Sequence, residues 1–150
     1  MEKEIEKNKP FDVKIVAASE EDAAFVDREL VMYNNSCVPF TQKPAFESIN
    51  RVLKNAEGEI VGGIICTMYC WRCFYIDVLW VKDSCRNSGY GSLLLQDAET
   101  IAREKECGLI HLDTFDFQAK DFYLKHGYEI FGELRDCPPG HARYYMKKTV

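Results

Sequence analysis

The sequence lacks any apolar stretch that approaches the roughly 20 residues needed to cross a membrane. Its first ten residues, MEKEIEKNKP, also lack the apolar core of a secretory signal peptide. Basic residues are not in excess either, because 24 Asp and Glu outnumber 19 Lys and Arg and give a formal net charge of −5. Nucleic-acid-binding proteins usually carry a basic excess, so we expect neither nucleic acid nor a membrane among the partners of this chain.

No internal repeat, low-complexity tract or linker interrupts the chain, and its 150 residues lie within the usual range for one domain. Hydrophobic residues make up 47% of the sequence and charged residues 29%, a composition typical of globular proteins. We therefore expect a single domain over residues 1–150, in which residues 1–10 form a loosely ordered N-terminal segment.

Seven cysteines are an odd number, and no secretion signal accompanies them. This combination favours reduced thiols and a cytoplasmic location over a disulfide framework. Cys70 and Cys73 form a CxxC motif, which elsewhere indicates zinc or redox chemistry. No second CxxC or HxxxH motif accompanies it, so a hairpin turn is the simpler interpretation and no metal is expected. A thiol or zinc protein stays as an alternative.

Hydrophobic periodicity predicts alternating strands and helices. Helices are expected over 20–35, with Ser19 as the N-cap, over 89–106 and over 118–126, with Gly127 closing the last. Strands are expected over 12–18, 49–54, 59–70, 73–81, 109–114, 128–134 and 142–146, and a loop or broken helix over 36–44. This mixture of hairpins and crossovers predicts an α+β fold (α/β mixed) with a mixed sheet.

Two of these elements carry more specific expectations. The run CFYIDVLWV over 73–81 is nearly all apolar and predicts a central strand buried on both faces, with Asp77 as its one charge. The helix over 89–106 is amphipathic, and its inward positions are predicted to be Leu93, Leu94, Ala98, Ile101 and Ala102.

The segment RNSGYGS, residues 86–92, leaves the predicted buried strand and opens the long helix. Two glycines allow close approach of the backbone to a ligand, and the N–H groups of a first helical turn have no partner within the helix. Together with the helix dipole and Arg86 they form a site suited to phosphate or pyrophosphate. The spacing differs from both the G-x-x-x-x-G-K-[ST] loop and the full G-x-G-x-x-G motif.

At this segment the sequence resembles the GNAT superfamily of acetyl-CoA-dependent N-acetyltransferases. The phosphate loop of that family reads R/Q-x-x-G-x-G/A, which Arg86 to Gly91 match at every defined position. Further pieces recur in the family's order over residues 12–148: GEIVGG, IDVLWV, the stretch 99–102, DTFDFQA, FYLKHGY and ELRDCPPGH. The resemblance implies a GNAT fold, in which helices flank a central, mixed, mostly antiparallel sheet whose two central strands splay apart.

The resemblance also implies how acetyl-CoA is held. It assigns the pyrophosphate to a backbone loop of Arg86, Asn87, Ser88, Gly89, Tyr90, Gly91 and Ser92. The pantetheine is assigned to the edge of the strand at Leu79, Trp80 and Val81, where free N–H groups can also polarise the thioester carbonyl.

Tyr123, in FYLKHGY, occupies the position of the family's tyrosine, which implies that it protonates the departing CoA thiolate. The alternative is a packing residue. The sequence departs from the family at Asp116, where asparagine is frequent, and a carboxylate there would repel CoA phosphates, so no cofactor contact is assigned to it.

The attacking amine must be neutral, and Asp77 is the candidate general base because an unpaired carboxylate in an apolar strand is costly. A structural carboxylate is the alternative, and Asp113 and Glu133 are weaker candidates for the base. Glu133 and His141 are also candidates for the substrate side.

The expected function is transfer of an acetyl group by direct attack of a primary amine, from a small molecule or a lysine-type acceptor. An acyl-CoA-binding sensor or scaffold without turnover is the alternative. Members of the resembling family are often homodimers, but no interface stripe is evident in this sequence.

Overall fold

A computed structural model of the chain describes residues 12–150, so the expectation of a loosely ordered segment over 1–10 lies outside the described residues. The chain divides into two units, one ending at Pro39 and one spanning Phe40–Val150. Each unit is described by itself.

The first unit contains helix α1 (Glu20–Cys37). Ser19 caps it as predicted: its hydroxyl accepts from the Asp22 N–H, and the Asp22 carboxylate accepts from the Ser19 N–H. The strand predicted over 12–18 is wrong, since these residues form none, and Val13, Ile15 and Val16 are exposed. Alternating apolar residues form a strand only where a neighbouring edge supplies hydrogen bonds, and this segment pairs with none of the described strands.

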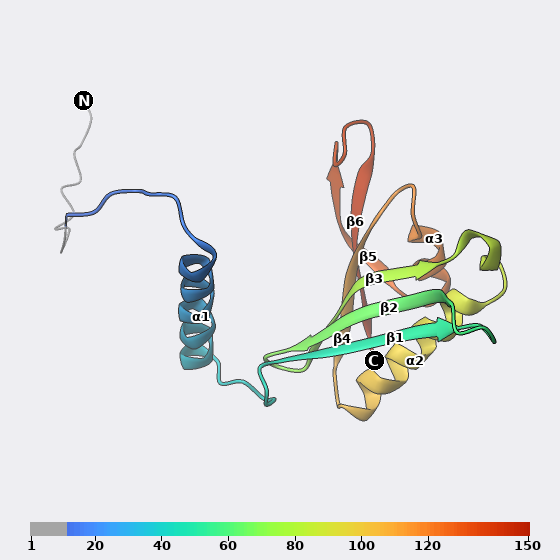
Figure 1. Ribbon diagram of the computed structural model, residues 1–150, viewed down its shortest axis with the longest axis horizontal. Coiled ribbons are helices and arrows are strands. Elements are labelled where there is room, and N and C mark those ends of the chain that lie inside the picture. Colours follow the sequence, from blue (N-terminus) through green and yellow to red (C-terminus); the bar gives the residue numbers. More distant parts are fainter. Residues whose placement is uncertain (1–11) are drawn as a thin grey trace. The chain divides into compact units, whose positions relative to one another are not determined.

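The second unit is built on one six-stranded sheet with the order β1-β2-β3-β4-β6-β5 (Figure 1). Only β3 and β4 pair in parallel, and the other four pairings are antiparallel, which confirms the predicted mixed, mostly antiparallel sheet. The strands are β1 (Phe46–Lys54), β2 (Ile60–Tyr69), β3 (Cys73–Val81), β4 (Leu109–Phe115), β5 (Glu129–Arg135) and β6 (Ala142–Thr149).

Three helical segments connect these strands: the short 3-10 helix η1 (Asp83–Cys85), α2 (Tyr90–Glu104) and α3 (Lys120–Lys125). The η1 and α2 segments form the crossover that the parallel β3–β4 pair requires. Gly127 follows α3 with φ +85°, in agreement with its predicted capping role. No helix within residues 12–150 combines the length and the apolar character that a membrane crossing needs.

The core lies between one face of the sheet and the apolar stripe of α2, whose buried members are Leu94, Leu95, Ala98 and Ala102. The prediction for Leu93 is wrong, because its side chain is 53% exposed. Of the other predicted positions, Leu94, Ala98 and Ala102 are buried and Ile101 packs against the core, which confirms them. A run of three leucines fits two helical phases, and Leu95 is buried in place of Leu93.

Glu99 is the charged residue of this buried stripe. Lys148 of β6 contacts both of its carboxylate oxygens, at 3.1 and 3.0 Å, and the Tyr128 hydroxyl donates to it at 3.1 Å. Arg103 lies one turn further along α2, with a guanidinium nitrogen 3.3 Å from the carboxylate. These contacts join α2 to β6 and to the segment that follows α3.

Lys148→Met removes the closer cation from the buried Glu99 carboxylate and leaves only the half-exposed Arg103 to balance it, so we expect the free energy of unfolding to fall by about 3 kcal/mol. Arg51→Met is the matched control, because the Arg51–Asp97 pair is half exposed and its loss costs at most about 1 kcal/mol. Urea denaturation measures both variants. Equal losses in the two would contradict the assigned role of Glu99.

Candidate functional site

The parallel strands β3 and β4 pair over only four residue pairs. The register runs from Cys73–Leu109 to Ile76–Leu112, after which β3 and β4 lead away from one another (Figure 1). The splay implied by the family resemblance is therefore present. From Asp77 to Val81, the edge of β3 that faces away from β2 makes no pairing with β4.

A β-bulge begins where the strands part. Ile65 of β2 pairs with Val78 and Cys66 with Ile76, so Asp77 has no register partner. The bulge shifts the alternation of β3, and consequently Ile76, Leu79 and Val81 all pack on the core.

Exposure along β3 departs from the sequence prediction. Within its own unit the strand is not buried on both faces, because Asp77, Val78 and Trp80 are exposed. Because Asp77 is exposed, the cost of burying its carboxylate, on which the prediction from the sequence rested, does not apply to it. Among residues 12–150 it makes no hydrogen bond or ion pair, which leaves it available for a ligand.

The loop from β3 to α2 has the backbone geometry that its glycines predict. Gly89 is the N-cap of α2 with φ +83°, and Asn87 has φ +60°. No side chain caps this helix, and no acidic residue lies in its first turn. Helix α1, by contrast, has a side-chain cap and three acidic residues in its first turn. The N–H groups of the first turn of α2 are therefore free for an anion.

Arg86 is half exposed beside this loop. Its Nε donates to the Val81 carbonyl at 3.0 Å, and one of its terminal nitrogens lies 2.8 Å from an Asp83 carboxylate oxygen. These contacts use part of the guanidinium and tie it to the end of β3, so donors remain for a second anion. Ser92 lies at the other end of the motif, with its hydroxyl 2.9 Å from Nε2 of His126.

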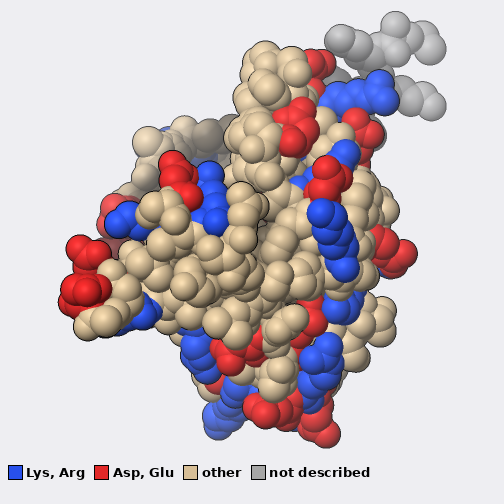
Figure 2. Space-filling view, turned by 90° about the vertical axis from the view of Figure 1, so that its right-hand side faces the viewer, with Lys and Arg blue, Asp and Glu red and all other residues tan. Residues whose placement is uncertain are grey.

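One cavity of about 800 Å³ brings most of the predicted residues together. It extends along the unpaired part of β3 to the start of α2 and across to α3. The predicted residues that line it are Asp77, Leu79, Trp80, Val81, Arg86, Asn87, Gly89, Tyr90, Gly91, Ser92 and Tyr123. Ser88, Glu133 and His141 do not line it. On the side where the β3–α2 loop lies, charged side chains surround a largely uncharged centre (Figure 2).

Tyr123 is buried in α3, with 5% of its surface exposed. Its ring packs edge-on against Phe122 and Tyr128, and the residue is among those that line the cavity. Burial raises the pKa of the Tyr123 phenol above its usual value, so the hydroxyl keeps its proton at neutral pH.

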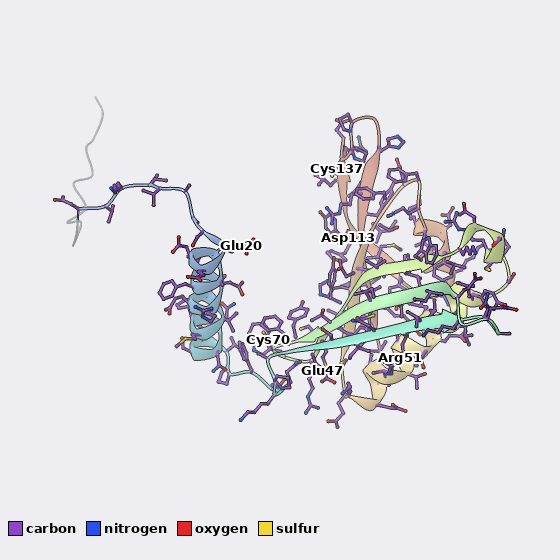
Figure 3. All side chains as sticks on the ribbon, viewed as in Figure 1. Glu20, Glu47, Arg51, Cys70, Asp113 and Cys137 are labelled. Atoms are coloured by element: carbon purple, nitrogen blue, oxygen red, sulfur yellow. The ribbon has the colours of Figure 1, made fainter. Side chains whose placement is uncertain are left out.

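Asp113 lies on β4 just beyond the last pair with β3, and it also lines the cavity (Figure 3). Its Oδ2 accepts from the Tyr75 hydroxyl at 3.0 Å, and its Oδ1 accepts from two nitrogens of Arg143, at 2.9 and 2.6 Å. Burial, followed by the contact with Asp113, raises the pKa of Tyr75 to about 12. Sequence reasoning missed this network because its members lie on three strands.

The two substrate-side candidates lie outside the cavity wall. Glu133 is exposed on β5 and lies 3.4 Å from Arg135. His141 is closer to the cavity, since its Nδ1 lies 2.9 Å from a carboxylate oxygen of Asp116, which lines the wall. The other oxygen of Asp116 accepts from the Ala142 N–H, so this carboxylate holds the end of β4 against the start of β6.

The CxxC motif forms the turn between β2 and β3, as predicted. Cys70 lies at the end of β3 remote from the β3–α2 loop (Figure 3). Within residues 12–150, no group of three or more His, Cys, Asp or Glu side chains is arranged to hold a metal ion.

Comparison with known proteins places this geometry in a family. Residues 19–128 match the model of the acetyltransferase (GNAT) family. The chain belongs to the GNAT acetyltransferase family. A blasticidin-S acetyltransferase from Streptomyces morookaense is 39% identical over 96 residues, which cover 63% of this chain and 69% of that protein.

Solved GNAT structures share the fold. An acetyltransferase from Bacillus cereus superposes with a TM-score of 0.84 at 39% identity, covering 92% of this chain and 98% of that one. An acetyltransferase from Bacillus anthracis, solved in complex with acetyl coenzyme A, has a TM-score of 0.62 at 23% identity and covers 74% and 66% of the two chains. The family resemblance and the fold predicted from the sequence are thereby confirmed.

Proposed function

We propose that this GNAT acetyltransferase transfers the acetyl group of acetyl-CoA to a primary amine of a small cationic molecule, by direct attack. The observation that carries the proposal is the shared cavity, in which an uncapped helix N-terminus, an unpaired strand edge, a buried phenol and an unpaired carboxylate meet. These four features correspond to the pyrophosphate, the thioester, the leaving thiolate and the amine.

The donor would lie along β3 and end at α2. The first-turn N–H groups at Tyr90, Gly91 and Ser92 suit the pyrophosphate, and the remaining donors of Arg86 can reach the same anion. The N–H groups along the unpaired edge of β3 suit the pantetheine and can stabilise the oxygen of the thioester carbonyl as negative charge develops on it.

In the reaction, the amine nitrogen bonds to the carbonyl carbon and the carbon–sulfur bond breaks. The CoA sulfur leaves as a thiolate and takes the phenolic proton of Tyr123, whose raised pKa keeps that proton in place until the thiolate forms. The proton of the amine passes to Asp77 or through water to solvent, which the exposure of Asp77 allows.

The acceptor is inferred from charge and from a relative. Asp77 offers an unpaired carboxylate to a cation, and the relative with 39% identity is named for a small antibiotic, blasticidin S. The carboxylate suits a cationic amine of either kind, and the name of the relative supports a small-molecule amine over a lysine-type acceptor on a protein. The seven free cysteines favour the reducing cytoplasm as the place of action.

The proposal is tested by incubating the full chain with acetyl-CoA and a panel of amines, and measuring acetylated products by mass spectrometry. We expect products from small cationic amines, blasticidin S included, and fewer from lysine peptides. Binding of acetyl-CoA with no product from any amine would instead support a sensor or scaffold. Mass spectrometry is preferable to a thiol reagent here, because the chain itself has seven free thiols.

Gly89→Glu should raise the Kd of CoA about 100-fold, because a carboxylate would enter the space of the pyrophosphate. Gly58→Glu is the matched control, because both glycines have positive φ, +83° and +81°, and an added Cβ would meet no neighbouring atom within 4 Å at either position. Gly58, however, lies in the β1–β2 turn. Isothermal titration calorimetry measures both variants. An unchanged Kd in Gly89→Glu would remove the loop from the donor site.

Two further substitutions separate the two ends of the reaction. Tyr123→Phe should lower kcat about 100-fold with less than about a twofold change in KM for acetyl-CoA, because only the proton is lost. Wild-type rates in Tyr123→Phe would assign Tyr123 to packing alone.

Asp77→Asn should instead lower kcat/KM for the amine and leave KM for acetyl-CoA unchanged.

A further inference from the structure

We propose that the Asp113–Arg143 pair sets the charge selectivity of the acceptor site, so that the enzyme prefers a singly charged amine to a doubly charged one. This inference rests on the proposed function and names the class of amine that the site takes.

Two carboxylates lie where the strands part. Ile76 and Leu112 are the last register partners of β3 and β4, and the next residues, Asp77 and Asp113, both line the cavity. An amine entering there meets the field of both side chains.

The two carboxylates differ in charge balance. Asp77 has no hydrogen-bond or ion-pair partner among residues 12–150. Asp113 has both oxygens occupied, Oδ2 by the Tyr75 hydroxyl and Oδ1 by Nε and a terminal nitrogen of Arg143, at 2.9 and 2.6 Å. The point where the strands part therefore presents one compensated and one uncompensated negative charge.

Arg143 does not itself line the cavity, and its side chain is 33% exposed. Its guanidinium lies over the rings of Phe115 and Tyr145, 5.5 Å from each centroid. These contacts and the raised pKa of Arg143, caused first by its hydrogen bonds to Asp113, keep the positive charge in place. Removing that charge would expose a second carboxylate to the acceptor.

The other charged groups of the cavity wall stay constant in this comparison. They are Arg86 and Lys120, together with Asp116, which is paired with His141, and Asp121. A change in selectivity on substitution of Arg143 therefore reports the Asp113–Arg143 pair itself.

The experiment compares 1-aminopentane with 1,5-diaminopentane, as competitors of the best acceptor found in the amine panel, at one pH and one ionic strength. Wild type should bind the monoamine more tightly. In Arg143→Gln the ratio of inhibition constants should move about tenfold toward the diamine, since a second charge at close range is worth about 1.4 kcal/mol. KM for acetyl-CoA should not change.

Two variants guard against a purely structural effect. Arg143→Lys keeps the charge and should keep the wild-type ratio. The double variant Asp113→Asn with Arg143→Gln removes both charges and should return the ratio to that of wild type, although it disturbs the structure most.

The outcomes are distinct. A ratio that stays constant in Arg143→Gln, a ratio that moves equally in the double variant, or competition by neither amine would overturn the charge-selectivity proposal alone. Failure of wild type to acetylate any amine would overturn the proposed function, and this inference with it.

Discussion

The candidate site depends on one constraint, which is that β3 and β4 pair over four residues and no further. If the pairing continued, the N–H groups of β3 would be consumed by the neighbouring strand and the cavity would close. Because it stops at Ile76 and Leu112, one strand edge, two carboxylates and the start of α2 come to line the same space. The chemistry attributed to the site uses groups that an uninterrupted sheet would occupy.

The strands can part because the helices hold the sheet together from one side. The paired half of β3 contributes Phe74 and Ile76 to a core shared with α2, while Lys148 and Tyr128 join the buried Glu99 to β6 and to the segment after α3. Ser92 and His126 join the start of α2 to the end of α3. These contacts replace the lost β3–β4 hydrogen bonds as links between the two halves of the sheet.

Local signals in the sequence predicted much of this arrangement. The cap at Ser19, the glycine-rich opening of α2 and the turn at Cys70–Cys73 follow from residues close together in the chain, and the family resemblance implied the splay. Features that depend on distant partners were missed. The bulge at Asp77 reflects the register with β2, and the Asp113 network reflects three strands.

The wrong expectations have the same origin. Residues 12–18 alternate as a strand does but find no edge among the described strands, and Leu93 lies on the exposed side of a leucine run whose phase the sequence left open. Asp77 was singled out for a cost of burial that its exposure removes, but exposure strengthens its candidacy on other grounds. A general base that must release the proton to solvent works better when its carboxylate is exposed than when it is buried.

The environments of Tyr123 and Asp77 also suit opposite halves of one reaction. Burial raises the pKa of the phenol, so the hydroxyl still carries its proton at neutral pH when the carbon–sulfur bond begins to break. The exposed Asp77 carboxylate carries no comparable desolvation cost and attracts a cation. The proton donor and proton acceptor proposed for this site therefore lie on different elements, Tyr123 on α3 and Asp77 on β3, and differ in exposure as the two proposed roles require.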